Sequence, residues 1–283
     1  MPALCCSPVS DPRVTIVIVA YSERAELERC LGSIRDHARV PVQIVLIDNA
    51  STDDTVPWAR KSHPEVEIVE LEKNIGVAAR QYGLDRARAP LTMFLDSDAA
   101  LTADALPAMV KALDQHPDWG LIGPRLIGDD GRLQLSSRRF PPLSLPLARR
   151  PPLARWLEDS RLVRRHLMAD VDHDLVRPVL YVLGACQMFR TELARAAGPF
   201  ADWIFLGHDD ADWCFRIRDA GGEIVYFPEA TVIHTYRRRT KSSPFSRAAL
   251  RQLRAFAAFQ WRYRKRRRAM LELQEDLDRR PAR

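Results

Sequence analysis

The chain has 283 residues, of which 46% are apolar and 28% are charged, and its formal net charge is +6 at pH 7. This composition is typical of ordinary globular domains, and the length suits one large α/β domain or two small ones. The basic excess is concentrated after Tyr236.

The cysteines and the apolar stretches exclude several classes of protein. The five cysteines are odd in number and lack metal-ligand spacing, so they predict neither a disulfide framework nor a zinc site. We interpret them as reduced thiols and therefore expect a cytoplasmic protein. No secretory signal pattern opens the chain, and no apolar stretch approaches the length of a membrane span. We expect any membrane contact to be peripheral, at the inner face of the plasma membrane.

Hydrophobic patterning predicts alternating strands and helices after a loose lead-in over residues 1–13. The β-branched run VTIVIVA at 14–20 is typical of a parallel strand that is buried on both faces. Four strand–helix alternations predict an α/β fold with a mostly parallel central sheet flanked by helices. The later strands of this series are expected at residues 42–47, 66–71, 91–95 and 119–123.

Polar residues gather where these strands end, which is the edge where open parallel sheets bind ligands. These residues are Tyr21, Asp48, Asn49, Asp96 and Asp98. The segment after the first strand, YSERAEL, lacks the glycines of a dinucleotide-binding GxGxxG loop. A nucleotide at this edge would therefore be held in another way.

The segment LTMFLDSDA at 91–99 places two aspartates at the end of an apolar strand. Asp96 and Asp98 are two residues apart on extended chain, so their carboxylates point to the same side. Their charges repel each other unless a cation lies between them, and Mg²⁺ is commonly held by one or two carboxylates plus substrate phosphates. A solvated acidic turn is the alternative interpretation.

The second half of the chain has a different character. Residues 124–178 are rich in proline and arginine, and we interpret them as a long excursion from the sheet with a helix over residues 153–168. A disordered insert is the alternative. Strand patterns return at 179–188, broken at Gly184, and at 223–227.

A second acidic cluster, Asp209, Asp210 and Asp212, precedes an apolar helix. One explanation is stabilisation of the helix N-terminus, where carboxylates are favoured. The other is a general base, because crowding by neighbouring carboxylates raises a pKa towards the working range. His234 follows the last predicted strand and is either a structural histidine or a nitrogen ligand for a metal.

Eight segments resemble, in order, the family-2 inverting glycosyltransferases of the GT-A fold, and in particular bacterial rhamnosyltransferases and related O-antigen and cell-wall enzymes. They are VTIVIVAYSERAELERCLGSI, VLIDNASTDDT, NIGVAARQYGL, MFLDSDA, GPRLIGDDGRLQLSSRRFP, LGACQMFRTELARAAGPF, HDDADWCFRIRDAGG and VIHTYRRRTKSS. The resemblance implies a GT-A domain over residues 14–243, followed by a basic amphipathic C-terminal helix or tail over residues 244–283.

The resemblance also implies roles for single residues. Asp98 matches a direct metal ligand, with Asp96 and His234 beside it. Asp210 matches the catalytic base, and Asp209, which stands where the family usually has Glu, is the alternative base. The residues implied in nucleotide-sugar binding are Tyr21, Glu23, Asp48, Asn49, Ser51, Asn74, Gly76, Arg80, Asp96 and Ser97, with Arg237 and Arg238 near the phosphates.

These roles imply transfer of a sugar, with rhamnose as the candidate, from a nucleoside-diphosphate donor. The implied acceptor is a hydroxyl of a glycan or lipid-linked molecule in cell-surface polysaccharide synthesis. Mg²⁺ or Mn²⁺ would neutralise the leaving diphosphate while a carboxylate deprotonates the acceptor. The basic, aromatic-rich end at 244–283 is expected either to contact an anionic membrane or to pack on the domain with a solvated basic face.

Two other functions use parts of the same pattern. A haloacid-dehalogenase-type phosphatase also carries DxD after an apolar strand, but it wants Thr or Val where Ala100 stands, and the motif usually lies on its first strand. A non-enzymatic basic protein would bind nucleic acid through its Lys and Arg clusters. That alternative leaves the acidic strand ends unexplained, so we expect no nucleic-acid partner.

Overall fold

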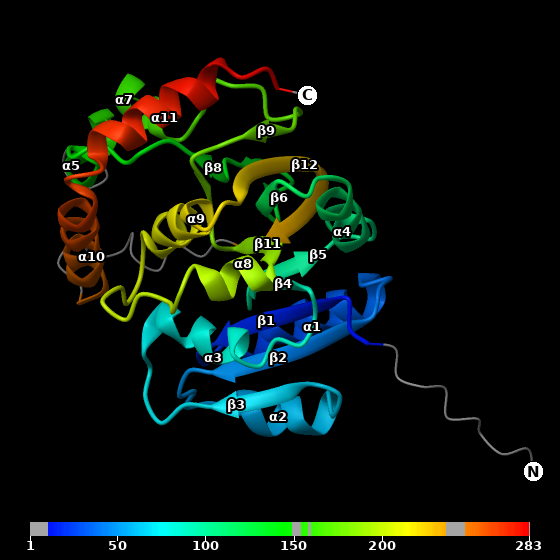
Figure 1. The fold of residues 1–283 in the computed structure, drawn as a ribbon. Coiled ribbons are helices and arrows are strands. Elements are labelled where there is room, and N and C mark those ends of the chain that lie inside the picture. The colour runs from blue at the N-terminus through cyan, green and yellow to red at the C-terminus, as the bar shows by residue number, and fades with distance from the viewer. Residues whose placement is uncertain (1–10, 149–153, 158–159, 236–246, 283) are drawn as a thin grey trace, which may run out of the picture.

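The computed structural model describes residues 11–148, 154–157, 160–235 and 247–282. One twisted sheet in the order β3-β2-β1-β4-β11-β6-β12-β5 forms the centre of the molecule (Figure 1). Two short strands attach to it, β7 (Leu133–Gln134) on β6 and β9 (Arg177–Pro178) on β12. The predicted α/β class with a central sheet and flanking helices is confirmed.

The first half of the sheet is parallel. Its strands are β1 (Val14–Ala20), β2 (Val42–Asp48), β3 (Glu67–Glu70) and β4 (Leu91–Asp96). Val14, Ile16 and Ile18 face one side of the sheet and Val17 faces the other, and all four are buried. The continuous β-branched run of β1 is thus explained by burial on both faces.

The second half of the sheet is mixed. Strand β11 (Cys186–Arg190) is antiparallel to both β4 and β6 (Trp119–Ile127). Strand β12 (Glu223–His234) runs parallel to β6 and extends well beyond the predicted end at residue 227. A register shift between Phe227 and Thr231 lets β12 continue across Pro228, which explains why the proline did not end the strand. The far end of β12 pairs with the short β5 (Ala99–Leu101).

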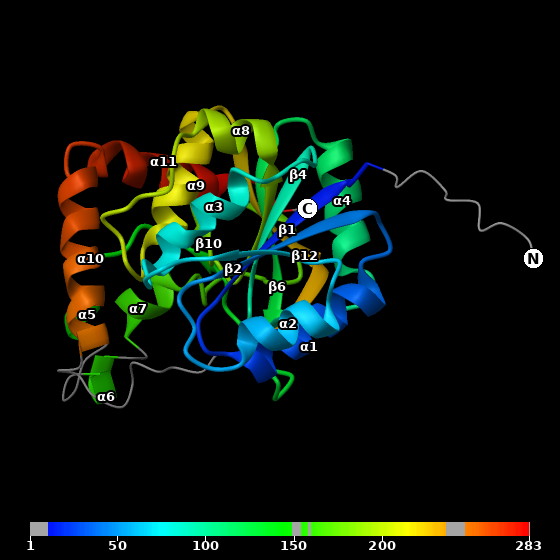
Figure 2. The same cartoon turned by 90° about the horizontal axis from the view of Figure 1, so that it is seen from below.

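Helices cover both faces of the sheet (Figure 2). One face carries α1 (Arg24–His37), α2 (Thr55–Ser62) and α4 (Ala105–Gln115), whose apolar side chains form one buried cluster. The other face carries the 3₁₀ turn η1 (Gly76–Ala79) with α3 (Arg80–Leu84), α8 (Thr191–Ala196) and α9 (Asp209–Asp219), which form the second cluster.

Helix α3 lies unusually close to the sheet because of one glycine. A Cβ added to Gly83 would meet Val17 Cγ1 of β1 at 2.1 Å. Only a residue without a side chain allows this approach, which brings Arg80, at the start of the same helix, over the ends of the strands.

The described part of the proline-rich segment at 124–178 folds into short strands and helices. It contains β7, β8 (Ser137–Arg138), α5 (Leu145–Ala148), α6 (Ala154–Leu157) and α7 (Arg161–His166). Strand β8 pairs with β10 (Tyr181–Val182). The single helix predicted over residues 153–168 is wrong, because the Ser160 side chain accepts from Val163 N and begins a separate helix at Arg161.

Two helices end the described chain, α10 (Arg247–Tyr263) and α11 (Arg267–Arg279). Four of their buried side chains, Phe259, Tyr263, Met270 and Leu277, belong to the same apolar cluster as α9. None of the helices in the described ranges is long and apolar enough to cross a membrane. The predicted domain boundary near residue 243 and most of the lead-in lie outside the described residues.

Candidate active site

The carboxyl ends of three neighbouring parallel strands bring two predicted acidic residues together. In the registers of β1 with its neighbours, Val19 pairs with Asp96 of β4 and Ala20 pairs with Asp48 of β2. Asp48 is buried, and its carboxylate accepts a hydrogen bond from Ser51 N at 3.1 Å. The predicted edge of the sheet is therefore acidic at the ends of the two strands that flank β1.

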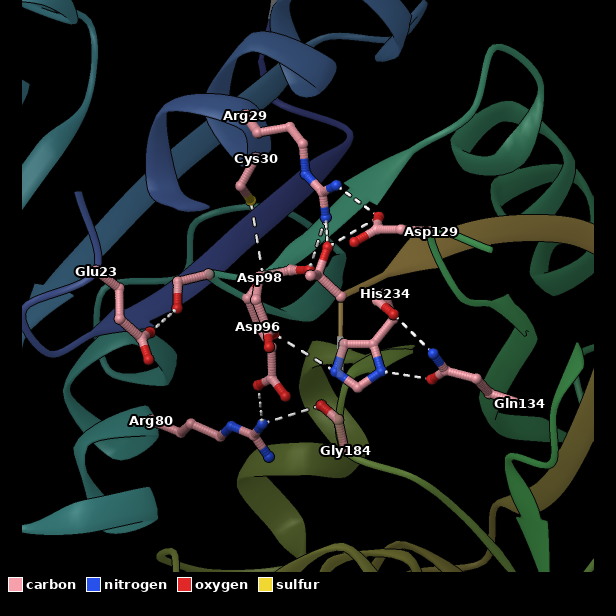
Figure 3. Close-up of polar contacts among 12 residues, drawn as sticks. Glu23, Arg29, Cys30, Arg80, Asp96, Asp98, Asp129, Gln134, Gly184 and His234 are labelled. Carbon is pink, nitrogen blue, oxygen red and sulfur yellow. Dashed lines mark hydrogen bonds and ion pairs between the residues drawn. The ribbon is translucent and has the colours of Figure 1, made fainter. Parts of the chain in front are cut away.

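Asp96, Asp98 and His234 converge at this edge (Figure 3). Their potential ligand atoms all lie within 4.8 Å of one another. Pairing of β12 with β5 places His234 opposite Ala99, and Thr235 N donates to Asp98 O at 2.9 Å. The pairing of these strands thus places His234 next to the aspartates at the end of β4, which lie more than 130 positions earlier in the chain.

His234 makes polar contacts through both ring nitrogens. Its Nε2 lies 3.4 Å from Asp98 Oδ1, and its Nδ1 lies 2.8 Å from Gln134 Oε1. Burial lowers the pKa of His234, but the hydrogen bond to Asp98 and the negative charges of Asp96 and Asp98 outweigh it and raise that pKa above its ordinary value. Gln134 was not predicted as a site residue, since no motif in the sequence singles it out as a partner of His234.

The donor set of this trio suits a divalent cation. Two carboxylates and an imidazole so close together leave an excess of negative charge, which a hard divalent cation such as Mg²⁺ or Mn²⁺ would neutralise. The Asp96 side chain is 40% exposed and that of Asp98 is 25% exposed, so the cluster is open to a ligand on one side. The residues present therefore fit the predicted metal.

A second unpredicted residue, Arg29 of α1, ties this edge together from outside (Figure 3). Its Nη1 donates to Asp129 Oδ1 at 2.7 Å, and its Nη2 donates to Asp98 O at 3.2 Å and also contacts Thr235 Oγ1. One guanidinium thus fixes three segments that are far apart in the sequence. Two of them, at Asp98 and at Thr235, carry or adjoin the candidate metal ligands.

Arg80 connects the predicted metal ligands to the second acidic cluster. Its Nη2 donates to Asp96 Oδ1 at 2.7 Å and to Gly184 O at 2.9 Å, and its Nη1 lies 3.3 Å from Asp209 Oδ2. The guanidinium also packs over the Phe94 ring at 5.3 Å. Burial lowers the pKa of Arg80, but the negative charges of Asp96 and Asp209 raise it by more, so its pKa lies above the ordinary value and the guanidinium stays charged.

Asp209 and Asp210 begin helix α9, and their environments differ. Burial raises the pKa of Asp209, and the Arg80 guanidinium opposes that rise. Burial and the adjacent Asp209 charge raise the pKa of Asp210 to about 7. Asp209 is therefore the carboxylate paired with the buried arginine, and Asp210 is the one that gains and loses a proton near neutral pH.

Asp212, the third acid of the cluster, is a structural residue. It is buried, and it accepts hydrogen bonds from Tyr263 Oη of α10 at 2.9 Å and from Arg216 Nε at 2.9 Å. Stabilisation of the start of a helix does not fully explain Asp212, because its hydrogen bond with Tyr263 also joins α9 to α10.

Three of the residues predicted to bind the nucleotide shape one loop at this edge. Asn49 is buried; its Oδ1 accepts from Ile75 N at 2.9 Å and its Nδ2 donates to Gly76 O at 3.1 Å. Asn74 Oδ1 accepts from Gly76 N at 2.9 Å. Gly76 has φ of +67°, and a Cβ there would lie 2.0 Å from Phe205 O, so only glycine fits.

The remaining predicted residues line the same edge. Tyr21 is 42% exposed at the end of β1. Ser97 Oγ donates to the Glu23 carboxylate, and Ser51 Oγ accepts from Ser22 N at 2.9 Å. Arg237 and Arg238 lie outside the described residues.

Comparison with known proteins identifies the family. The profile described as "Glycosyl transferase family 2" matches residues 15–195, which is more than half of the chain. The chain belongs to glycosyl transferase family 2. This family-2 protein is therefore a glycosyl-transferring enzyme, as its sequence predicted.

Two curated relatives extend over most of this family-2 enzyme. One is the N-acetylglucosaminyl-diphospho-decaprenol L-rhamnosyltransferase of Mycobacterium tuberculosis, 26% identical over 257 residues that cover 83% of this chain and 80% of that protein. Another is the pre-mycofactocin glycosyltransferase of the same species, 26% identical over 241 residues that cover 81% of this chain and 45% of that protein.

Solved structures support the GT-A fold. The mannosyltransferase PcManGT from Pyrobaculum calidifontis, in complex with GDP-Man and Mn²⁺, matches with a TM-score of 0.57 and 23% identity, over 81% of this chain and 59% of that one. GalNAc-T7 with UDP, GalNAc and Mn²⁺ matches with a TM-score of 0.62 and 16% identity, over 85% of this chain and 47% of that one. At these identities the likeness concerns the fold alone.

The Arg80 bridge leads to a stability prediction. Arg80→Met should lower the free energy of unfolding by about 3–5 kcal/mol at neutral pH, because it leaves the buried Asp209 carboxylate without its cation. Arg80→Met/Asp209→Asn should recover part of that loss, since no buried charge then remains unpaired. Urea denaturation measures both, with the exposed Arg132→Met as the matched control. A loss below 1 kcal/mol for Arg80→Met would contradict the assigned role.

Proposed function

We propose that this family-2 enzyme is a metal-dependent inverting glycosyltransferase that uses a nucleoside-diphosphate sugar. The observation that carries the proposal is the arrangement around Arg80, with the Asp96–Asp98–His234 trio on one side and the Asp209–Asp210 pair on the other. A site for the donor phosphates and a site for proton transfer are thereby held a fixed, short distance apart.

Asp98, Asp96 and His234 would hold Mg²⁺ or Mn²⁺ on the donor side. A bound divalent cation supplies charge neutralisation for the diphosphate leaving group. Asp48 with Tyr21 and Glu23 would border the base and ribose at the neighbouring strand ends. Asn49 and Asn74 act indirectly, by holding the loop at Gly76 in the shape that the donor meets.

Asp210 would be the general base. Its carboxylate takes the proton from the acceptor hydroxyl as that oxygen attacks the anomeric carbon. The new glycosidic C–O bond forms while the bond from the anomeric carbon to the phosphate oxygen breaks, and the nucleoside diphosphate leaves with the bonding electrons. One displacement inverts the anomeric centre. A pKa of about 7 suits Asp210 to this role near neutral pH.

The candidate donor sugar and acceptor come from the relatives. The Mycobacterium tuberculosis relative is named as an L-rhamnosyltransferase acting on N-acetylglucosaminyl-diphospho-decaprenol. We propose a nucleoside-diphosphate rhamnose as the first donor to test and a lipid-diphosphate-linked glycan as the acceptor, in cell-surface polysaccharide synthesis. Family membership argues against the phosphatase and the nucleic-acid-binding alternatives.

Helix α10 supports peripheral contact with an anionic membrane at the inner face of the plasma membrane. Its segment RAALRQLRAFAAFQWRY contains no acidic residue. Leu250 is 47% exposed and Trp261 is 68% exposed, and Arg254 of the same helix and Lys265, just after its end, are also exposed. A basic surface with an exposed indole is the composition that binds anionic lipid interfaces.

Asp210→Asn should abolish sugar transfer while donor binding stays within a few-fold of wild type. For the wild type, kcat/KM should fall as the pH drops below about 7, because a protonated Asp210 cannot accept the acceptor's proton. The raised pKa means that ionised Asp210 opposes folding at neutral pH, so the Asn variant should be at least as stable as wild type there. Loss of donor binding together with turnover would indicate a structural role instead.

Asp98→Ala should abolish the metal-dependent part of donor binding. In a thermal-shift screen of nucleotide sugars, a true donor should stabilise the wild type only with Mn²⁺ or Mg²⁺ present, because ligand binding to the folded state raises its melting temperature. The Asp98→Ala variant should lose that metal-dependent rise, and Asp210→Asn should keep it. Equal activity of the wild type in excess chelator would disprove metal dependence.

The membrane contact is tested by flotation of the full chain with vesicles. Wild type should float with vesicles containing anionic phospholipid and stay behind with neutral ones. Arg254→Glu/Lys265→Glu and Trp261→Ala should reduce flotation several-fold, since they reverse charge or remove the exposed indole. Arg132→Glu, on a different exposed segment, is the control. No binding of the wild type at low salt would rule the contact out.

A further inference from the structure

We infer that Gln134 is a positioning residue that fixes the tautomer and the ring orientation of His234 for metal binding. The inference rests on the proposed metal-dependent function and adds a residue to it. Gln134 lies at the end of β7, and both β7 and β12 pair with β6, so the sheet itself places the amide beside His234. Figure 3 shows Gln134 on the side of the imidazole opposite the two aspartates.

Two hydrogen bonds determine which way the Gln134 amide faces. Its Nε2 donates to the backbone carbonyl oxygen of His234 at 2.7 Å, and its Oε1 lies 2.8 Å from His234 Nδ1. A carbonyl oxygen can only accept, so the NH₂ group must face it. The amide oxygen is then the atom that faces the ring.

The orientation of the amide determines the proton on the imidazole. The amide oxygen can only accept, so His234 Nδ1 must carry a hydrogen. In the neutral ring this leaves the lone pair on Nε2, the nitrogen that lies 3.4 Å from Asp98 Oδ1. Ligating histidines commonly donate their other ring N–H to an oxygen acceptor in this way, which fixes the ring and strengthens its lone pair.

The same amide also fixes the backbone. Because Gln134 holds both the ring and the carbonyl of His234, the ring cannot turn about its side-chain torsions without losing one of the two bonds. Thr235 N donates a hydrogen bond to the backbone oxygen of Asp98 at 2.9 Å. The backbone that carries the Asp98 carboxylate is therefore fixed to the residue that follows His234. Gln134 therefore completes a preorganised ligand set that binds a cation without first ordering the histidine.

The test is the affinity of the purified full chain for Mn²⁺ alone, measured from the electron paramagnetic resonance signal of the free ion. Gln134→Leu should weaken Mn²⁺ binding by about 10- to 100-fold, the usual effect of losing such a partner. Gln134→Glu keeps an acceptor for Nδ1–H but loses the donor to the His234 carbonyl, so its affinity should lie between those of wild type and Gln134→Leu. Leu133→Ala, the exposed neighbour on β7, should leave the affinity unchanged.

A double-mutant comparison separates positioning from general damage to the fold. Adding Gln134→Leu to His234→Ala should cause no further loss of Mn²⁺ affinity, since the residue acts through a ring that is no longer there. An additional loss in the double mutant would overturn the inference. So would a Gln134→Leu variant that binds Mn²⁺ as tightly as wild type.

Mn²⁺ binding by the wild type tests the metal site itself, separately from the role of Gln134. Absence of saturable Mn²⁺ binding by the wild type would remove the metal site of the proposed function itself. Nitrogen chemical shifts of the imidazoles, assigned with His234→Ala, give an independent readout in the metal-free chain. His234 should show a protonated Nδ1 in the wild type at high pH, and a pyridine-like Nδ1 there would contradict the role of Gln134.

Discussion

The structure depends on one buried cation. Arg80 has only 6% of its surface exposed, yet its guanidinium must stay charged, so every group around it is constrained to compensate that charge. The compensation comes from the end of β4, from the carbonyl of Gly184 ahead of β11 and from the first residue of α9. The approach of α3 to β1 over Gly83 makes this possible, because it brings the arginine above the strand ends.

The same cation gives two neighbouring carboxylates different surroundings. Asp209 is paired with Arg80, while Asp210 next to it is raised in pKa by burial and by the charge of Asp209. Burial raises the pKa of both acids, and Asp209 also has the Arg80 guanidinium at 3.3 Å. A charge more than 120 residues earlier in the sequence thus makes the surroundings of two adjacent aspartates different.

Hydrophobic patterning was sufficient to predict the parallel half of the sheet and the acidic edge where it ends, because β1 and β4 are buried on both faces and are continuous apolar runs. It could not predict the far end of β12, whose register shift carries the strand past Pro228 to His234. Hydrophobic patterning also could not predict which residues contact the site residues. Gln134 and His234 are 100 residues apart, and Tyr263 and Asp212 are 51 apart, so only the folded sheet and helices show that they meet.

The loop before α9 joins the predicted donor side, the acid pair and the C-terminal helix. Val77 N donates to Phe205 O at 3.1 Å, so the turn that follows Asn74 rests on this loop. Arg251 of α10 lies over the Phe205 ring at 4.1 Å, and Phe259 stacks on His208, directly before Asp209. Helix α10 therefore packs with its inner face against the residues that precede α9. A change in the position of α10 has a short path of packed contacts to both halves of the site, because the loop between them touches all three.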